Sequence, residues 1–222
     1  MAEQKKHRRS PHDGEATREA LTDAAEKLFA EQGVEAVSIR AINAAAGLAP
    51  AAVHYHFGSK EALLEAVFER RGRAVLSDIV QRCDRLLEQG GRPDPRDIVD
   101  ALVSPYVALL ERDQAGGARW LSIIGQLALN QDERMEASAA PATDRLQNLA
   151  RMAFPDADPA QLEATLRLTI EALILLMARR PSDWSAPGSS GPTAMRETLI
   201  DFAVGGLSHA LRCAGGRPTT AS

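Results

Sequence analysis

Four side chains that can bind phosphate lie within one short stretch, namely His54, Tyr55, His56 and Lys60. Imidazole, phenol and ammonium groups can all donate hydrogen bonds to phosphate oxygens. The window from 36 to 60 contains no Asp or Glu, although the whole chain of 222 residues carries a net charge of −4. A surface without carboxylates does not repel a polyanion, so this window indicates contact with a phosphate backbone. Because the whole chain is acidic, the contact surface must be a local patch.

The two histidines raise a second possibility, a metal site. His54 and His56 are two residues apart, however, and on a helix such a pair does not share a face. The only cysteines, Cys83 and Cys213, are far apart and lack the spacing of a zinc site. The sequence therefore predicts neither a metal nor a cofactor.

The sequence also lacks the motifs that carry common enzyme chemistry. It has no Gly-x-Ser-x-Gly elbow, no P-loop and no dinucleotide-binding fingerprint, so we expect a protein that is not an enzyme. No secretory signal and no apolar run of the roughly 18 residues needed to cross a bilayer is present. Unpaired cysteines fit a reducing compartment. We expect a soluble, cytoplasmic protein without a membrane partner.

Helical periodicity predicts the elements that position the phosphate-binding side chains. Apolar residues repeat at helical spacing from Leu21 to Phe29, and Gly33 ends this first helix. A short helix is predicted from Ser38, a favourable N-cap, to Gly47. A second short helix follows from Ala49 or Pro50 to Gly58. Ser59 is predicted to cap the next helix, whose core stripe runs from Leu63 to Phe68.

Two short helices joined at Gly47 have the plan of a helix-turn-helix, in which the second helix enters the DNA major groove. Val53 and Phe57, four residues apart, are predicted to pack this second helix inward. Small outward side chains would let its backbone approach the base edges closely. The predicted DNA-binding residues are Ser38, Arg40, Ala49, Pro50, Ala51, His54, Tyr55, His56 and Lys60.

The basic residues near the N-terminus allow two interpretations. Lys5, Lys6, Arg8 and Arg9 form either an arm that grips DNA or a tail that aids solubility. Both interpretations stay open from the sequence.

The stretch from 38 to 64, SIRAINAAAGLAPAAVHYHFGSKEALL, resembles the DNA-binding domain of TetR-family transcriptional repressors. Three features carry the resemblance: Gly47 after the first short helix, Tyr55-His56-Phe57 at the end of the second, and Ser59-Lys60-Glu61 at the start of the next. The end of the preceding helix, LFAEQG at 28–33, also matches. The resemblance covers residues 15–70. His54 departs from the family, in which many members have a Tyr, and so does the pair Pro50-Ala51.

The resemblance implies a function and a mechanism. It implies a homodimer that binds a palindromic operator in double-stranded DNA, usually as a repressor. A small-molecule effector bound in the second domain would then release the operator. The residues alone do not name the effector, the operator or the genes controlled.

Beyond residue 73 the helical period continues, and no β-strand period persists. The stripes from Leu76 to Leu87, Ile98 to Leu109 and Trp120 to Ala128 predict three helices, with a kink at Pro105 in the second. A weaker helix is predicted from Ala142 to Phe154, and two further helices at 159–180 and 193–213. We therefore predict an all-α fold, with a three-helix helix-turn-helix domain at 1–70 and a helical ligand-binding and dimerisation domain at 71–222.

The second domain is predicted to hold both a dimer interface and a ligand site. The helices 159–180 and 193–213 would pair with their symmetry mates in a four-helix bundle, through Leu166, Ile170, Leu173, Phe202, Gly206 and Ala210. A largely apolar ligand would lie among Tyr106, Trp120, Ile124 and Met177. A single buried aromatic on each helix is, however, more often part of an ordinary core.

Two other functions stay open from the sequence. One is a helical DNA-binding dimer without any small-molecule ligand, in which the second domain only dimerises. The other is a protein–protein interaction module, or an enzyme, on the same helical scaffold.

Overall fold

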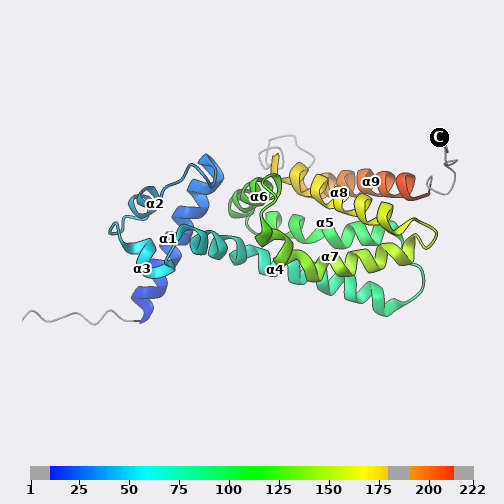
Figure 1. The fold of residues 1–222 in the computed structure, drawn as a ribbon, viewed down its shortest axis with the longest axis horizontal. Coiled ribbons are helices and arrows are strands. Elements are labelled where there is room, and N and C mark those ends of the chain that lie inside the picture. The colour runs from blue at the N-terminus through cyan, green and yellow to red at the C-terminus, as the bar shows by residue number, and fades with distance from the viewer. Residues whose placement is uncertain (1–10, 180–190, 213–222) are drawn as a thin grey trace, which may run out of the picture. The chain divides into compact units, whose positions relative to one another are not determined.

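The computed structural model describes residues 11–179 and 191–212, which form nine helices and no strand (Figure 1). In chain order they are α1 (Pro11–Gln32), α2 (Ile39–Ala45), α3 (Ala52–Phe57), α4 (Lys60–Gln89), α5 (Pro95–Arg112), α6 (Gln114–Leu129), α7 (Glu133–Ala153), α8 (Pro159–Arg179) and α9 (Gly191–Arg212). The predicted all-α fold is confirmed. The N-terminal basic residues and Cys213 lie outside the described residues.

The chain divides into two compact units, Met1–Arg70 and Arg71–Ser222. Helix α4 begins in the first unit and continues in the second. Each unit has a buried apolar core of its own. None of the helices among the described residues is long and apolar enough to cross a membrane.

The first unit is built from α1, α2, α3 and the start of α4. Helix α1 contacts both short helices, and its Leu21 and Phe29 are fully buried, as are Ile42 of α2 and Val53 of α3. Two predicted N-caps are present. The Ser38 Oγ accepts from the Ala41 amide at 3.2 Å, and the Ser59 Oγ accepts from the Ala62 amide at 3.1 Å.

Glycines end both short helices in the left-handed conformation. The φ angle is +67° at Gly47 and +83° at Gly58, a region that side chains with a Cβ rarely adopt. The Gly58 amide donates to the carbonyl of His54 at 3.1 Å and so closes α3. The tight turns therefore depend on the residue type at both positions.

The second unit is a bundle in which α5, α7, α8 and α9 lie alongside one another (Figure 1). Helix α6 packs on α5 and α8. The approach of α6 to α8 is very close, because a Cβ added at Gly125 would lie 2.5 Å from the Ala178 Cβ. Only a glycine at this position lets the two helices pack at that distance.

Two details of the second unit differ from the sequence prediction. Helix α7 begins at Glu133 and includes Pro141, whereas the periodicity predicted a start at Ala142; Asp132 caps the earlier start by accepting from the Arg134 amide at 3.0 Å. Helix α5 runs without a break through Pro105, and the kink at that residue stays a prediction. In the part of α4 beyond Arg70, the buried apolar side chains are those of Val75, Ile79 and Cys83, while Leu76, Val80 and Leu87 are half-buried.

Candidate DNA-binding surface and regulatory core

The predicted DNA-binding residues lie along α2, the turn after it and α3. Most of them are exposed: Ser38, Arg40, Ala49, Pro50, Ala51, His54 and Tyr55. His56 and Lys60 are half-buried. Tyr55 is 78% exposed, which is unusual for a large aromatic side chain, and its ring lies against that of His56 in an edge-on arrangement with centroids 4.9 Å apart. The first unit therefore presents an aromatic side chain and an imidazole outward on a short helix.

Internal contacts determine which atoms of His54 and Lys60 are left for DNA. The His54 Nδ1 lies 2.9 Å from the Gly58 carbonyl oxygen. Because a carbonyl only accepts, Nδ1 must carry the proton, and Nε2 is the nitrogen left to contact another group. The Lys60 Nζ donates to the Glu35 carbonyl at 3.4 Å, which leaves two of its three protons for a phosphate. Among the residues that the structure describes, no group of three or more His, Cys, Asp or Glu side chains could hold a metal ion.

Sequence reasoning missed Asn43, a buried polar side chain in the middle of the motif. Asn43 is 1% exposed. Its Nδ2 donates to the Pro50 carbonyl at 2.6 Å, and its Oδ1 accepts from the Val53 amide at 3.1 Å. The amide thus connects α2 to the turn and to the first turn of α3. The signal available in the sequence was the position of Asn43, directly after Ile42 and four residues after Ile39, which is the spacing of one helix face.

Sequence reasoning also missed Arg18 of α1, which contacts the other end of α3. A guanidinium nitrogen of Arg18 donates to the His56 carbonyl, and the guanidinium carbon lies 4.1 Å from the centre of the Phe57 ring. A cation is favourable at a helix C-terminus and over an aromatic face. Phe57 was predicted to point inward and is half-buried, with Arg18 stacked on its ring.

In the second unit, apolar side chains on α8 and α9 remain exposed. Leu168 is 66% exposed, Leu176 is 44% exposed and Phe202 is 63% exposed. Gly205 and Gly206 are exposed beside Phe202, and nothing lies within 4 Å of a Cβ added at either glycine. We refer to these five exposed residues of α8 and α9 together as the apolar face.

The other predicted interface residues lie deeper in the protomer. Leu166 and Leu173 are 3% and 1% exposed, so they already belong to the core of the second unit. Ile170 and Ala210 are half-buried. Of the six predicted residues, only Phe202 and Gly206 belong to the apolar face, whereas Leu168 and Leu176 were not predicted.

All four predicted ligand-binding residues are buried in the core of the second unit: Tyr106, Trp120, Ile124 and Met177. The rings of Tyr106 and Trp120 stack with centroids 6.3 Å apart. Burial raises the pKa of Tyr106 to about 12. No hydrogen bond joins the Tyr106 hydroxyl to any group within the described parts of the chain. A buried hydroxyl of this kind is rare in a folded protein.

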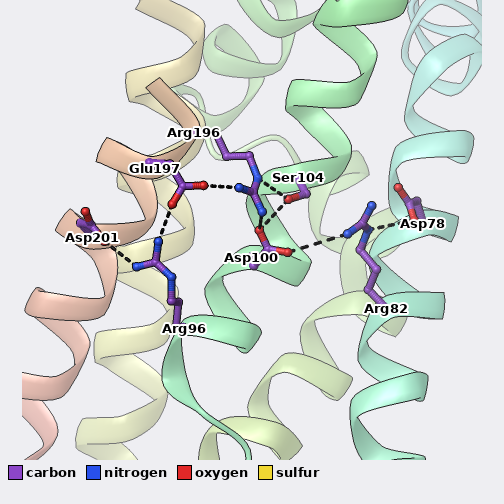
Figure 2. A network of polar contacts seen from close by, with 8 residues as sticks. All are labelled: Asp78, Arg82, Arg96, Asp100, Ser104, Arg196, Glu197 and Asp201. Carbon is purple, nitrogen blue, oxygen red and sulfur yellow. Dashed lines mark hydrogen bonds and ion pairs between the residues drawn. The ribbon is translucent and has the colours of Figure 1, made fainter. Parts of the chain in front are cut away.

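A network of charged side chains joins α4, α5 and α9 within the second unit (Figure 2). Arg196 of α9 pairs with Asp100 of α5 and donates from Nε to the Ser104 Oγ at 2.8 Å. Asp100 also lies 3.8 Å from a guanidinium nitrogen of Arg82, which pairs with Asp78 at 3.0 Å along α4. The network ties three helices together by half-buried ion pairs.

The same network continues at the start of α5 (Figure 2). Arg96 pairs with Asp201 at 2.5 Å and with Glu197, both on α9. Arg196 also contacts Glu197, its neighbour in sequence. Arg96 and Arg196 thus anchor the part of α9 that carries Phe202.

A helix-turn-helix with a carboxylate-free outward surface, next in sequence to a separate helical unit, is the arrangement of a DNA-binding transcriptional regulator. A family model described as "Bacterial regulatory proteins, tetR family" matches residues 21–67. A second, described as "Tetracyclin repressor-like, C-terminal domain", matches residues 100–206. The chain belongs to the TetR family of transcriptional regulators, whose members bind DNA operators, act as dimers and are not enzymes.

Individual relatives agree with this assignment. The chain is 32% identical to the HTH-type transcriptional regulator BetI of Rhizobium meliloti over 53% of this chain and 55% of that one. It is 28% identical to the HTH-type transcriptional repressor KstR2 of Rhodococcus jostii over 51% of this chain and 53% of that one. The matched part of the chain thus spans about half the length of these curated relatives.

Solved structures extend the likeness over most of the chain. The crystal structure of a TetR family transcription regulator from Marinobacter aquaeolei VT8 superposes with a TM-score of 0.61 at 19% identity, and covers 89% of this chain and 98% of that one. The repressor SmeT of the Stenotrophomonas maltophilia multidrug efflux pump SmeDEF superposes with a TM-score of 0.58 at 24% identity, and covers 95% of this chain and all of that one. At these identities the likeness concerns the fold alone.

Proposed function

We propose that this protein is a homodimeric repressor that binds a palindromic operator and releases it when a small, uncharged ligand binds in the second unit. The exposed Tyr55, on a helix within a carboxylate-free window, is the observation that carries the DNA-binding part. An exposed phenol has no role in the core, and it can donate a hydrogen bond to a phosphate or a base edge. His54 Nε2, Arg40 and Lys60 would contact DNA beside it.

The apolar face supports the homodimer. Three large apolar side chains are exposed on two neighbouring helices, and Gly205 and Gly206 would let a partner helix approach closely. A twofold axis would place the same face of a second copy against it, and the symmetry of such a dimer matches that of a palindrome. The proposed interface consists of Leu168, Leu176, Phe202, Gly205 and Gly206.

The unpaired Tyr106 hydroxyl supports a ligand in the second unit. A ligand atom that accepts its proton would satisfy a group that is costly to bury alone. Apart from Ser104, which bonds to Asp100 and Arg196, the buried side chains described in this unit include no charged or aliphatic polar residue. A charged ligand would therefore lack a buried counter-charge near Tyr106 and Trp120, so the proposed ligand is uncharged and largely apolar.

Helix α4 offers the connection between the two functions, because it begins in the first unit and continues in the second. A ligand that favours one arrangement of the second unit would change the separation of the two recognition helices in the dimer. Binding of ligand and binding of DNA would then oppose each other with the same coupling free energy.

Selection of DNA from a random-sequence duplex library by the full-length protein tests the proposed function. We expect an enriched palindrome, and we expect two protomers per duplex by sedimentation. A neutral-compound thermal-shift screen then tests the ligand, because a compound that binds the folded state raises the unfolding temperature. Any compound that does so should also release the selected duplex. Enrichment of no sequence would contradict operator binding.

The second candidate function is a DNA-binding dimer without a ligand. The close approach of α6 to α8 at Gly125 favours it, because the two helices leave no space between them at that point. A selected operator together with a thermal-shift screen that yields no compound would support this alternative.

A further inference from the structure

The recognition helix α3 lacks the features that normally hold a helix start in place. It contains six residues, and a helix of that length is not stable by itself. Its N-cap residue, Ala51, has no side-chain acceptor for the amides of the first turn. Those amides need a partner, because unpaired amides at a buried helix end are costly.

Asn43 supplies this missing partner from another helix. The Asn43 Oδ1 accepts from the amide of Val53, the second residue of α3, at 3.1 Å. An N-cap side chain would normally accept from that position or the next. The Asn43 Nδ2 donates at 2.6 Å to the carbonyl of Pro50, which lies just before the helix. The planar amide thus holds the chain on both sides of the helix start.

The orientation of this amide is fixed by its partners. The Val53 amide can only donate and the Pro50 carbonyl can only accept, so the Asn43 oxygen and nitrogen have only one arrangement that satisfies both. The side chain is 1% exposed, so water does not replace either bond readily. Asp could keep the bond to Val53 but not the one to Pro50, and an aliphatic residue would keep neither.

We infer that Asn43 is a positioning residue for DNA reading, which caps α3 from α2 and thereby fixes the recognition helix in the orientation that presents Tyr55 and His54. The inference rests on the proposed operator binding. Without the amide, α3 would stay attached through Val53 and Phe57, but its start would move relative to α2. Contacts to base edges require fixed geometry, whereas non-specific attraction to phosphates does not.

The test compares Asn43→Leu and Asn43→Asp with the wild type in the full-length protein. Two affinities are measured well below the unfolding temperature: one for a duplex that the wild type selects from a random library, and one for poly(dI-dC) as a non-specific competitor. The ratio of these affinities removes the general effect of the added Asp charge. We expect Asn43→Leu to lower the ratio about tenfold, the size of effect expected when hydrogen bonds to buried groups are lost. Asn43→Asp should fall between Asn43→Leu and the wild type.

Thr22→Val is the matched control. Thr22 is also a buried polar residue of the first unit, but its hydroxyl donates to the Arg18 carbonyl at 2.9 Å within α1 and does not contact α3. This variant should lose stability and keep the affinity ratio of the wild type. If Asn43 contributed only stability, Asn43→Leu would behave in the same way, and the inference would be wrong.

Hydrogen exchange of the Val53 amide gives a second measurement that does not depend on DNA. Exchange should become faster in Asn43→Leu and stay close to the wild-type rate in Asn43→Asp. An unchanged rate in Asn43→Leu would overturn the capping role. If the wild type selects no DNA sequence, the proposed operator binding and the role of Asn43 in it are both wrong, while the exchange rates still decide whether Asn43 caps α3.

Discussion

The ring centres of Tyr106 and Trp120 lie 6.3 Å apart in the core of the second unit, and the ring planes are inclined by 27°. This stacked pair joins α5 to α6, and the Tyr106 side chain has no hydrogen-bond partner for its hydroxyl among the described residues. The Tyr106 ring therefore contributes to the packing, while its hydroxyl forms no hydrogen bond with the described residues.

Tyr106→Phe tests this unused hydroxyl. We expect the unliganded variant to be more stable than the wild type, by about 1 kcal/mol, because the substitution removes a buried polar group and keeps the ring. Thermal or denaturant unfolding measures the difference. A neutral ketone that stabilises the wild type should bind the variant about tenfold more weakly. A less stable variant would mean that the hydroxyl has a partner, such as a buried water.

Lys60→Met tests the contribution of Lys60 to phosphate binding. The slope of log K against log salt should decrease by about one, because one fewer cation is released from the DNA. A filter-binding titration with the selected duplex measures it. Lys27→Met is the control, since Lys27 is an exposed lysine of α1 outside the carboxylate-free window. Equal slopes for Lys60→Met and the wild type would refute the phosphate contact.

Phe202→Glu tests the apolar face. A charge within the proposed twofold interface would occur twice and would lose its hydration on association. We expect the variant to sediment as a monomer at micromolar concentration, where the wild type sediments as a dimer. Leu129→Glu is the matched control, because Leu129 is an apolar residue of α6 that is 70% exposed and lies outside the apolar face. A dimeric Phe202→Glu variant would place the interface elsewhere.

Arg196→Met tests the charged network in Figure 2. The substitution leaves Asp100 with Arg82, at 3.8 Å, as its remaining cationic partner, and removes the hydrogen bond to Ser104. We expect a loss of about 1 kcal/mol in the free energy of unfolding, since the network is half exposed and partly screened by solvent. Arg112→Met serves as the control, because Arg112 donates to the carbonyl of Ala108 within its own helix. Equal losses in the two variants would show that the network adds no specific stability.

Much of the fold was predictable because it depends on local patterns. The helical period of apolar residues predicted α2, α3, α8 and α9 close to their observed bounds, and it predicted the end of α1 but not its start at Pro11. The N-caps at Ser38 and Ser59 and the helix ends at Gly47 and Gly58 depend on a residue and its immediate neighbours. The carboxylate-free window is likewise a property of the sequence, and the assignment of its residues to DNA contacts stays a prediction.

Only the tertiary structure could decide which side of an apolar helix faces the core. Helix α8 carries apolar residues on several sides, so the sequence did not show which side faces the core of the protomer. Leu166, predicted at the dimer interface, is buried within the protomer, whereas Leu168 is 66% exposed. That distinction depends on where α6, α7 and α9 pack. The start of α7 at Glu133 was missed because Pro141 is normally unfavourable inside a helix.

The contacts that hold the recognition helix were also decided by tertiary structure. Asn43 is seven residues from Pro50 and ten from Val53, and Arg18 is 38 residues from His56. Sequence patterns report the preference of a residue for a local conformation, and both Asn and Arg usually prefer solvent. Asn43 and Arg18 are paired here because α1 and α2 fold against α3. This packing brings the Val53 amide and the Pro50 carbonyl within reach of Asn43, and the His56 carbonyl within reach of Arg18.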